Sequence, residues 1–237
     1  MEFHFSIREA LRDSWTLFKT HWQFFTSIAA VVALLNILGG GKRTPILVSL
    51  ILGVAAFIWS IVMMKISLAA ADGKAELLSF SSVKEMFPSW QQILGMAGVG
   101  ILGGLLILAG LVLLIIPGIY VAFRLGLANL SYIDRGEGIR KALRHSWEIT
   151  KGPIFWTAVL ISLVSLVLYI VGIIFFGIGI LVTYPLALIL MAKFYRAATA
   201  HHGVAQTVVP QPQEIKAPEP LATPEPEAHH ESETPVQ

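Results

Sequence analysis

Residues 93–116 read ILGMAGVGILGGLLILAGLVLLII and contain no charged side chain. A run of this length exceeds the roughly 20 apolar residues that a helix needs to cross the hydrocarbon core of a bilayer. The whole chain has 237 residues, of which 55% are hydrophobic and only 14% are charged. Globular domains carry about 25% charged residues. The sequence therefore predicts an integral membrane protein.

Further apolar segments flank this run on both sides. We place the boundary between the third and fourth spans at Pro117-Gly118, because proline suits the first turn of a helix and displaces the preceding residue from the α region. Arg124 lies inside the fourth segment, so whether residues 117–133 span fully is left open. The predicted fold is an all-α membrane protein with about six transmembrane helices, at residues 22–39, 45–70, 92–116, 117–133, 154–175 and 178–198.

Two amphipathic segments nearly repeat each other. IREALRDSWTLFK (7–19) and IRKALRHSWEITK (139–151) agree at 8 of 13 positions, and each precedes a pair of apolar spans. Their apolar residues recur at the spacing of one helical face, which is typical of a helix lying in the membrane interface. SSVKEMFPSW (81–90) is a weaker copy. We predict three parallel repeats, each an interfacial helix plus a two-span hairpin, at roughly 5–72, 79–134 and 136–200 of a membrane domain that covers residues 1–201.

Basic residues indicate the orientation of the chain. Every Lys and Arg except Lys42, Arg43 and Lys216 falls on the side of the N-terminus and of the two long connections. Because cytoplasmic loops carry the excess of Lys and Arg, both termini are expected in the cytoplasm, with the spans in the cytoplasmic (inner) membrane. Residues 202–237, rich in Pro and Glu, are predicted to form a disordered cytoplasmic tail.

Several residues are candidates for contact with lipid. Lys65, Arg124 and Lys193 each lie in the second span of a repeat, so three cations are placed to form a ring around an anionic headgroup or phosphate. The alternative is snorkelling, in which the long side chains reach back to the interface. Further candidates on the third amphipathic segment are Arg140, Lys141 and Arg144. The expected interfacial anchors are Trp15, Trp90 and Trp147.

Motifs of catalysis are not found in the sequence. No Asp or Glu lies within an apolar run, there is no cysteine, and no HExxH, GxSxG or Walker A pattern occurs. We therefore expect no catalytic residue, metal site, cofactor or nucleic-acid partner. The favoured hypothesis is a non-enzymatic module that engages anionic lipid headgroups, a membrane-protein partner or a second copy of itself. The alternative is a small transporter or channel built from three parallel hairpin repeats.

Residues 115–152, IIPGIYVAFRLGLANLSYIDRGEGIRKALRHSWEITKG, resemble a known membrane domain. It is the bacterial multi-pass domain found fused to some glycerophosphodiester phosphodiesterases and in stand-alone membrane proteins of unassigned function. Asn129 stands where that group often has proline. The resemblance implies a membrane module near lipid or envelope processes, without the hydrolase activity of the fused domain. The matching positions are Pro117, Gly118, Ile119, Arg124, Ala142, Leu143, Ser146, Trp147, Lys151 and Gly152.

Overall fold

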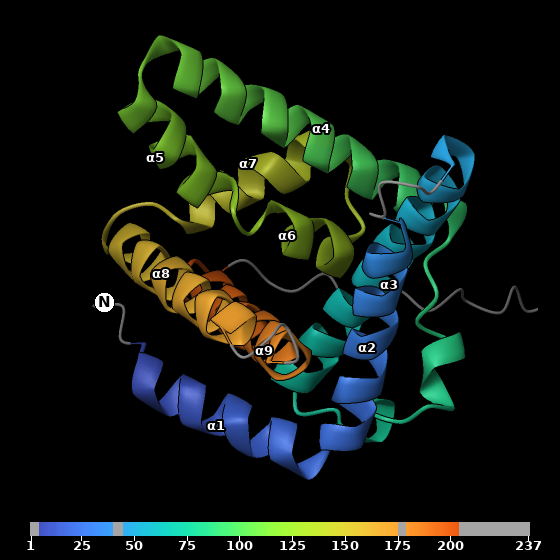
Figure 1. Ribbon diagram of the computed structural model, residues 1–237. Coiled ribbons are helices and arrows are strands. Elements are labelled where there is room, and N and C mark those ends of the chain that lie inside the picture. The colour runs from blue at the N-terminus through green and yellow to red at the C-terminus, as the bar shows by residue number, and fades with distance from the viewer. Residues whose placement is uncertain (1–4, 40–44, 175–178, 204–237) are drawn as a thin grey trace, which may run out of the picture. The chain divides into compact units, whose positions relative to one another are not determined.

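The computed structural model describes residues 5–39, 45–174 and 179–203, and all regular structure in these ranges is helical (Figure 1). This confirms the predicted all-α class. The helices are α1 (Ile7–Thr20), α2 (Trp22–Gly39), α3 (Ile46–Ala71), the short 3₁₀ turns η1 (Ala75–Leu77) and η2 (Ser82–Lys84), α4 (Trp90–Leu113), α5 (Ile115–Leu125), α6 (Ala128–Arg135), α7 (Ile139–Ile149), α8 (Pro153–Ile174) and α9 (Ile180–His201).

Six helical segments in the described ranges are long and apolar enough to cross a membrane. Each matches a predicted span to within a few residues, so the prediction of a multi-pass helical protein is confirmed at this level. The fourth segment consists of α5 and α6 together, interrupted near Gly126. The segments are Trp22–Gly39, Ile46–Ala71, Trp90–Leu113, Ile115–Arg135, Pro153–Ile174 and Ile180–His201.

The turn between α4 and α5 comes earlier than predicted. Leu114, with φ −163° and ψ 142°, interrupts the helix, and Pro117 falls inside the first turn of α5. A nitrogen in the first turn has no intrahelical acceptor, so proline loses nothing there. Glycines let the two helices meet closely: a Cβ on Gly110 would lie 2.8 Å from the Cα of Gly118. The boundary predicted at Pro117-Gly118 is therefore three residues too late, and Pro117 is the third residue of α5.

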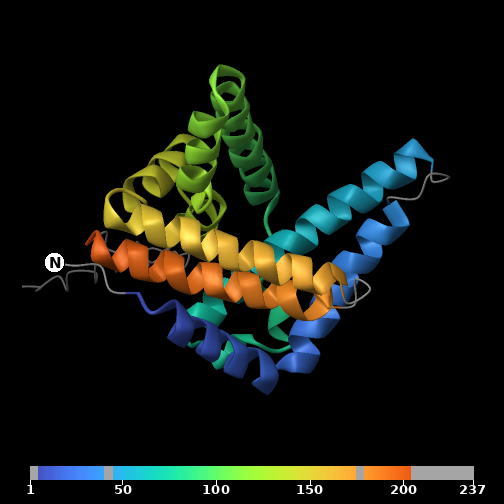
Figure 2. The same ribbon diagram turned by 60° about the vertical axis from the view of Figure 1, so that its left-hand side comes forward.

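Helix α9 lies at the centre of the described structure. It packs against α1, α2, α3, α6 and α8, and Figures 1 and 2 show α8 and α9 side by side. Leu190 and Tyr195 belong to an apolar cluster that includes residues of α1 and α8, while Ile189 belongs to one formed with α2 and α3. The last predicted span therefore holds the other elements together.

The two strong amphipathic segments are helices, as predicted, but their apolar faces are buried against protein. In α1, Ala10, Ser14 and Phe18 are buried, and the helix packs on α9. In α7, Ala142 and Leu143 are buried where the helix meets α4, α5 and α6. Helix α1 also contacts α2, and Trp15 on its predicted apolar face stays 42% exposed. The apolar faces are therefore largely buried against protein, and the placement of these helices in the membrane interface stays a prediction.

The weak third copy of the amphipathic segment is not an α-helix. Residues 81–90 contain only the 3₁₀ turn η2, because Pro88 disfavours the helical conformation of the residue before it. Ser89 then begins α4 with a capping box: its hydroxyl accepts from the Gln92 backbone N–H, and the Gln92 side chain accepts from the Ser89 N–H. The predicted helix at the start of the second repeat is therefore wrong.

The symmetry of three repeats stays a prediction. In Figure 2 the far ends of the α2–α3 and α4–α5 hairpins diverge. Lys42 and Arg43, the connection at 175–178 and the predicted tail from residue 204 onward lie outside the described residues.

Candidate functional site at the charged ends of three helices

An ion cluster joins the C-terminal ends of α3, α6 and α9. The Arg196 guanidinium donates to both carboxylate oxygens of Asp72, at 2.6 and 2.8 Å, and to Asp134 at 2.6 Å. The Tyr195 hydroxyl donates to the other Asp134 oxygen at 2.9 Å. The three charged side chains are only 13–21% exposed. Paired, fork-shaped contacts of this kind are the stronger class of hydrogen bond, so the cluster fixes the three helix ends to one another.

The cluster forms one wall of a hollow that we call the charged pocket. Its volume is about 290 Å³, and its lining includes Lys65, Asp72, Lys74, Asp134 and Arg196. Three cations against two carboxylates leave one positive charge in excess. Arg196 is fully engaged by the two carboxylates. The excess charge therefore belongs to the lysines.

Lys65 is the cation of this pocket that has no carboxylate partner. Its Nζ donates to the Oε1 atom of Gln92 at 2.8 Å, and the side chain is half-buried. Lys74, by contrast, lies 4.0 Å from Asp72. A neutral amide does not offset the charge of a half-buried ammonium group. Lys65 is therefore free to bind an anion that enters the pocket.

The predicted ring of three cations does not form. Lys65 bonds to Gln92 of α4, Lys193 lies 3.3 Å from Asp13 of α1, and Arg124 donates to the Thr150 carbonyl after α7. Neither Lys193 nor Arg124 lines the charged pocket. Each long side chain reaches a neighbour contributed by a different element, which hydropathy and spacing do not reveal.

Arg124 instead fastens α5 to α7. Its guanidinium carbon lies 4.6 Å from the Trp147 ring centroid and 5.4 Å from that of Tyr120. In return, the Ser146 hydroxyl donates to the Arg124 carbonyl at 2.8 Å. Arg124 is only 5% exposed. Arg124 therefore holds α5 to α7, and half-buried Trp147 covers it. Anion binding by Arg124 and interfacial anchoring by Trp147 stay predictions.

The polar face of α7 is turned outward. Arg140, Lys141 and Arg144 are exposed, and Arg144 donates to Glu148 at 2.9 Å. The hydrogen bond from Arg144 lowers the pKa of Glu148 below its usual value. On the buried face, burial and then the charge of Arg135 lower the pKa of His145, which favours the neutral imidazole. The three exposed cations are placed to meet an anionic surface.

The remaining predicted anchors are exposed. Trp15 is 42% exposed on α1, and Trp90 is 69% exposed at the first position of α4. Amphipathic indole rings of this kind favour the headgroup level of a bilayer. They are consistent with a membrane interface near these two helix ends.

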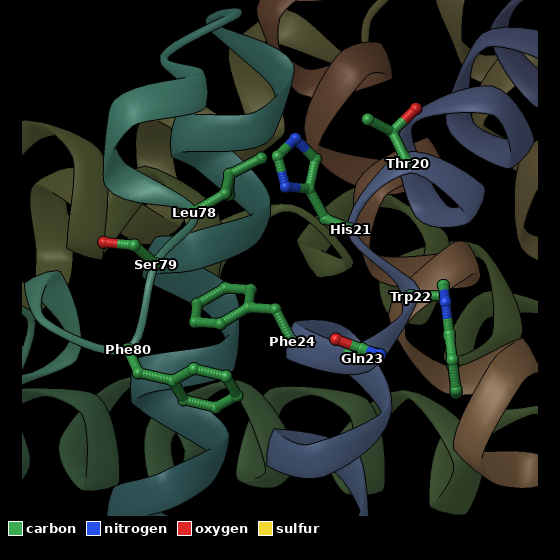
Figure 3. A pocket seen from close by; sticks show the side chains of 8 residues that line it. All are labelled: Thr20, His21, Trp22, Gln23, Phe24, Leu78, Ser79 and Phe80. Carbon is green, nitrogen blue, oxygen red and sulfur yellow. The ribbon is translucent and has the colours of Figure 1, made fainter.

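A second hollow, of about 420 Å³, lies at the corner between α1 and α2 (Figure 3). The Phe24 and Phe80 rings pack edge to face there, with centroids 5.2 Å apart. Figure 3 shows His21 near these rings, whereas Trp22 points away from them. None of the residues that line this hollow is a Lys or Arg. This hollow lacks the cations of the charged pocket.

Sequence reasoning missed Arg196 and the convergence of Asp72 and Asp134 on it. A usable signal was present, since each of the three residues lies at or just before the C-terminal end of a second span in a predicted repeat. Opposite charges at equivalent helix ends are expected to pair. The spacing did not reveal that α9 packs against both α3 and α6.

Within residues 5–39, 45–174 and 179–203, no three His, Asp or Glu side chains are placed to hold a metal ion. Over its described residues the chain is all-helical, with six helical segments long and apolar enough to cross a membrane and a charged pocket at three helix ends. No protein-family model, curated protein or solved structure matches it.

Proposed function

We propose that the chain is a non-enzymatic module of the bacterial cytoplasmic membrane that binds an anionic lipid headgroup in the charged pocket. Lys65 carries the proposal: it is a half-buried cation with a neutral partner, in a pocket with one positive charge in excess. A phosphate group would supply the missing negative charge. Residues 115–152 resemble the membrane domain that is fused to some glycerophosphodiester phosphodiesterases. This resemblance supports the same role.

An apolar cleft beside the pocket suits the acyl chains of such a lipid. The cleft lies between α3 and α4 and has a volume of about 430 Å³. Its walls include Phe57 of α3 together with Trp90 and Ile93 of α4. Gln92, which lies between those two residues of α4 in the sequence, lines the charged pocket. One lipid can therefore place its headgroup at Lys65 and its chains in the cleft.

The proposed orientation places the charged pocket on the cytoplasmic side. The described connection between α3 and α4 and the segment between α6 and α7 contribute Lys74, Lys84 and Arg135 at this end of the spans. The excess of Lys and Arg on one side supports a cytoplasmic location for that side and for both termini. Anionic lipids of the inner leaflet would face the pocket.

Lys65→Gln is expected to reduce the retention of phosphatidylglycerol relative to phosphatidylcholine roughly fivefold, since one basic residue near the surface contributes about 1 kcal/mol to anionic-lipid binding. Glutamine keeps a hydrogen-bonding group beside Gln92 and removes only the charge. The measurement is native mass spectrometry of the full chain after exchange with equal amounts of the two lipids.

Lys193→Gln is the matched control, because Lys193 pairs with Asp13 and does not line the pocket. It is expected to leave the lipid preference unchanged. Equal losses in both variants, or no loss in Lys65→Gln while its unfolding midpoint stays at the wild-type value, would rule out a headgroup site at Lys65.

Removing the three exposed cations of α7 is expected to weaken the general attraction to anionic lipid. The variant Arg140→Gln, Lys141→Gln, Arg144→Gln should lower phosphatidylglycerol enrichment in mixed nanodiscs roughly tenfold at low salt. The difference should largely vanish at high salt, because exposed charges are screened. A loss that does not respond to salt would argue against surface attraction by α7.

A small transporter or channel is the second candidate. The observation that favours it is the interruption of the fourth span at Gly126, beside a mainly apolar cavity whose lining includes Asn129 and Ser165. Broken helices frequently bind the substrate in transporters. Reconstituted liposomes would then pass a small solute faster than empty ones, and an absence of flux for every compact ion and polar solute tried would reject this candidate.

A further inference from the structure

The fourth span is broken where α5 ends and α6 begins. The Gly126 N–H turns back to the Phe123 carbonyl at 3.4 Å, and Leu127 adopts φ −96° and ψ 1°. Helix α6 starts at Ala128 without a side chain that caps it. The backbone N–H groups of a first helical turn have no intrahelical acceptors. The break thus leaves the backbone N–H groups of the first turn of α6, and the positive end of its helix dipole, inside the fourth span.

A cavity of about 130 Å³ lies beside this break. Its lining includes Gly126 and Asn129 at the start of α6 and Ser165 and Tyr169 of α8. Ser165 is only 6% exposed, and its hydroxyl has no hydrogen-bond partner. A buried hydroxyl without a partner costs free energy. Ser165 therefore indicates that the cavity holds something able to accept a hydrogen bond.

The chemistry of the cavity wall favours an anion. Hydroxyl, amide and helix N-terminal N–H groups all donate hydrogen bonds, and none of the residues that line the cavity is an Asp or Glu. A cation would require carboxylates or several carbonyl oxygens. At about 30 Å³ for each water molecule, the volume suits a compact ion with a few waters.

The charged pocket lies on the same three helices, about one turn nearer their C-terminal ends. Met64 and Leu130 line the cavity, whereas Leu68 and Asp134, four residues further along α3 and α6, line the charged pocket. On α9 the corresponding residues are Met191 and Arg196. The excess positive charge of the pocket would raise the local concentration of anions near the C-terminal ends of these helices.

We propose that the break in the fourth span holds a compact monovalent anion of the chloride class, which reaches it from the charged pocket. The Ser165 hydroxyl and the first turn of α6 bind the ion by hydrogen bonds, as helix N-termini bind anions elsewhere. This inference is independent of lipid binding. It concerns a different cavity and a different ligand.

The test uses the full chain in detergent, with chloride replaced by gluconate at constant ionic strength. Gluconate is an anion too large for the cavity. Since a ligand that binds only the folded state stabilises it by mass action, chloride should raise the unfolding midpoint saturably. Ser165→Ala is expected to weaken the apparent chloride affinity about tenfold, because a hydrogen bond to a charged group is lost.

Ser162→Ala is the matched control on the same helix, since the Ser162 hydroxyl is already satisfied by the Ala158 carbonyl at 2.8 Å. Its chloride dependence should equal that of the wild type. A wild-type protein without saturable chloride dependence would overturn the proposal, and so would equal losses in the two serine variants. Lipid retention by Ser165→Ala should stay unchanged. The experiment can therefore reject the anion site without rejecting the lipid site, and the reverse.

Discussion

Arg196→Ala is expected to lower the unfolding midpoint of the chain by roughly 10 °C, from a loss of about 3 kcal/mol. The substitution leaves the carboxylates of Asp72 and Asp134, which are 21% and 13% exposed, without their shared cation. Asp72 then keeps only Lys74, at 4.0 Å, and Asp134 only the Tyr195 hydroxyl, so the two carboxylates at the ends of α3 and α6 repel each other. Thermal unfolding of the purified chain in detergent measures the effect.

Arg144→Ala is the control for this prediction. Arg144 pairs with Glu148, but its side chain is 81% exposed, and exposed ion pairs contribute little. The unfolding midpoint of Arg144→Ala should stay close to that of the wild type. Adding Asp72→Asn and Asp134→Asn to Arg196→Ala should recover part of the loss, because the amides remove the repulsion. If Arg196→Ala unfolds at the same temperature as Arg144→Ala, the cluster does not hold the three helices together.

Gly118→Ala is expected to destabilise the chain by about 2 kcal/mol, which is typical of overpacking. A Cβ at this position would lie 2.6 Å from the backbone nitrogen of Leu111. Because backbone atoms of α4 stand in the way, no side-chain movement relieves the clash and the α4–α5 hairpin must open. The same thermal unfolding experiment measures the loss.

Gly104→Ala is expected to change the stability of the chain in the opposite direction from Gly118→Ala. Gly104 lies on α4 as well, but an added Cβ there meets nothing within 4 Å. Alanine has the higher helix propensity by about 1 kcal/mol, so this variant should be as stable as the wild type or slightly more stable. Destabilisation of both variants to the same extent would show that glycine itself, and not the contact of α4 with α5, is required.

Local sequence was sufficient for the elements of this fold. The apolar runs predicted the six long helices, because a membrane span is defined by length and hydropathy alone. The spacing of apolar residues likewise predicted the helices α1 and α7, but it assigned their apolar faces to the membrane interface, whereas much of each face packs on other helices. The two wrong predictions, the helix over residues 81–90 and the boundary at Pro117, also have local causes. Pro88 prevents a helix over residues 81–90, and Leu114 rather than Ile116 takes the extended conformation before Pro117.

Tertiary structure decided which partners the charged groups have. Lys65, Arg124 and Lys193 occupy similar places in the predicted repeats, yet each bonds to a different element. Long side chains take the nearest acceptor, and the nearest acceptor depends on how helices pack. Arg196 is at the centre of the site because α9 packs against both α3 and α6, which carry Asp72 and Asp134 near their ends.

For the described residues, the sequence by itself therefore determined the all-helical class, the positions of the six apolar segments, and the amphipathic character of α1 and α7. Those properties follow from composition and from the 3.6-residue period of a helix. The packing of the helices decided the rest: the ion cluster at Arg196, the neutral partner of Lys65 and the cavity beside Ser165. These features depend on contacts between residues far apart in the chain, which no local pattern specifies.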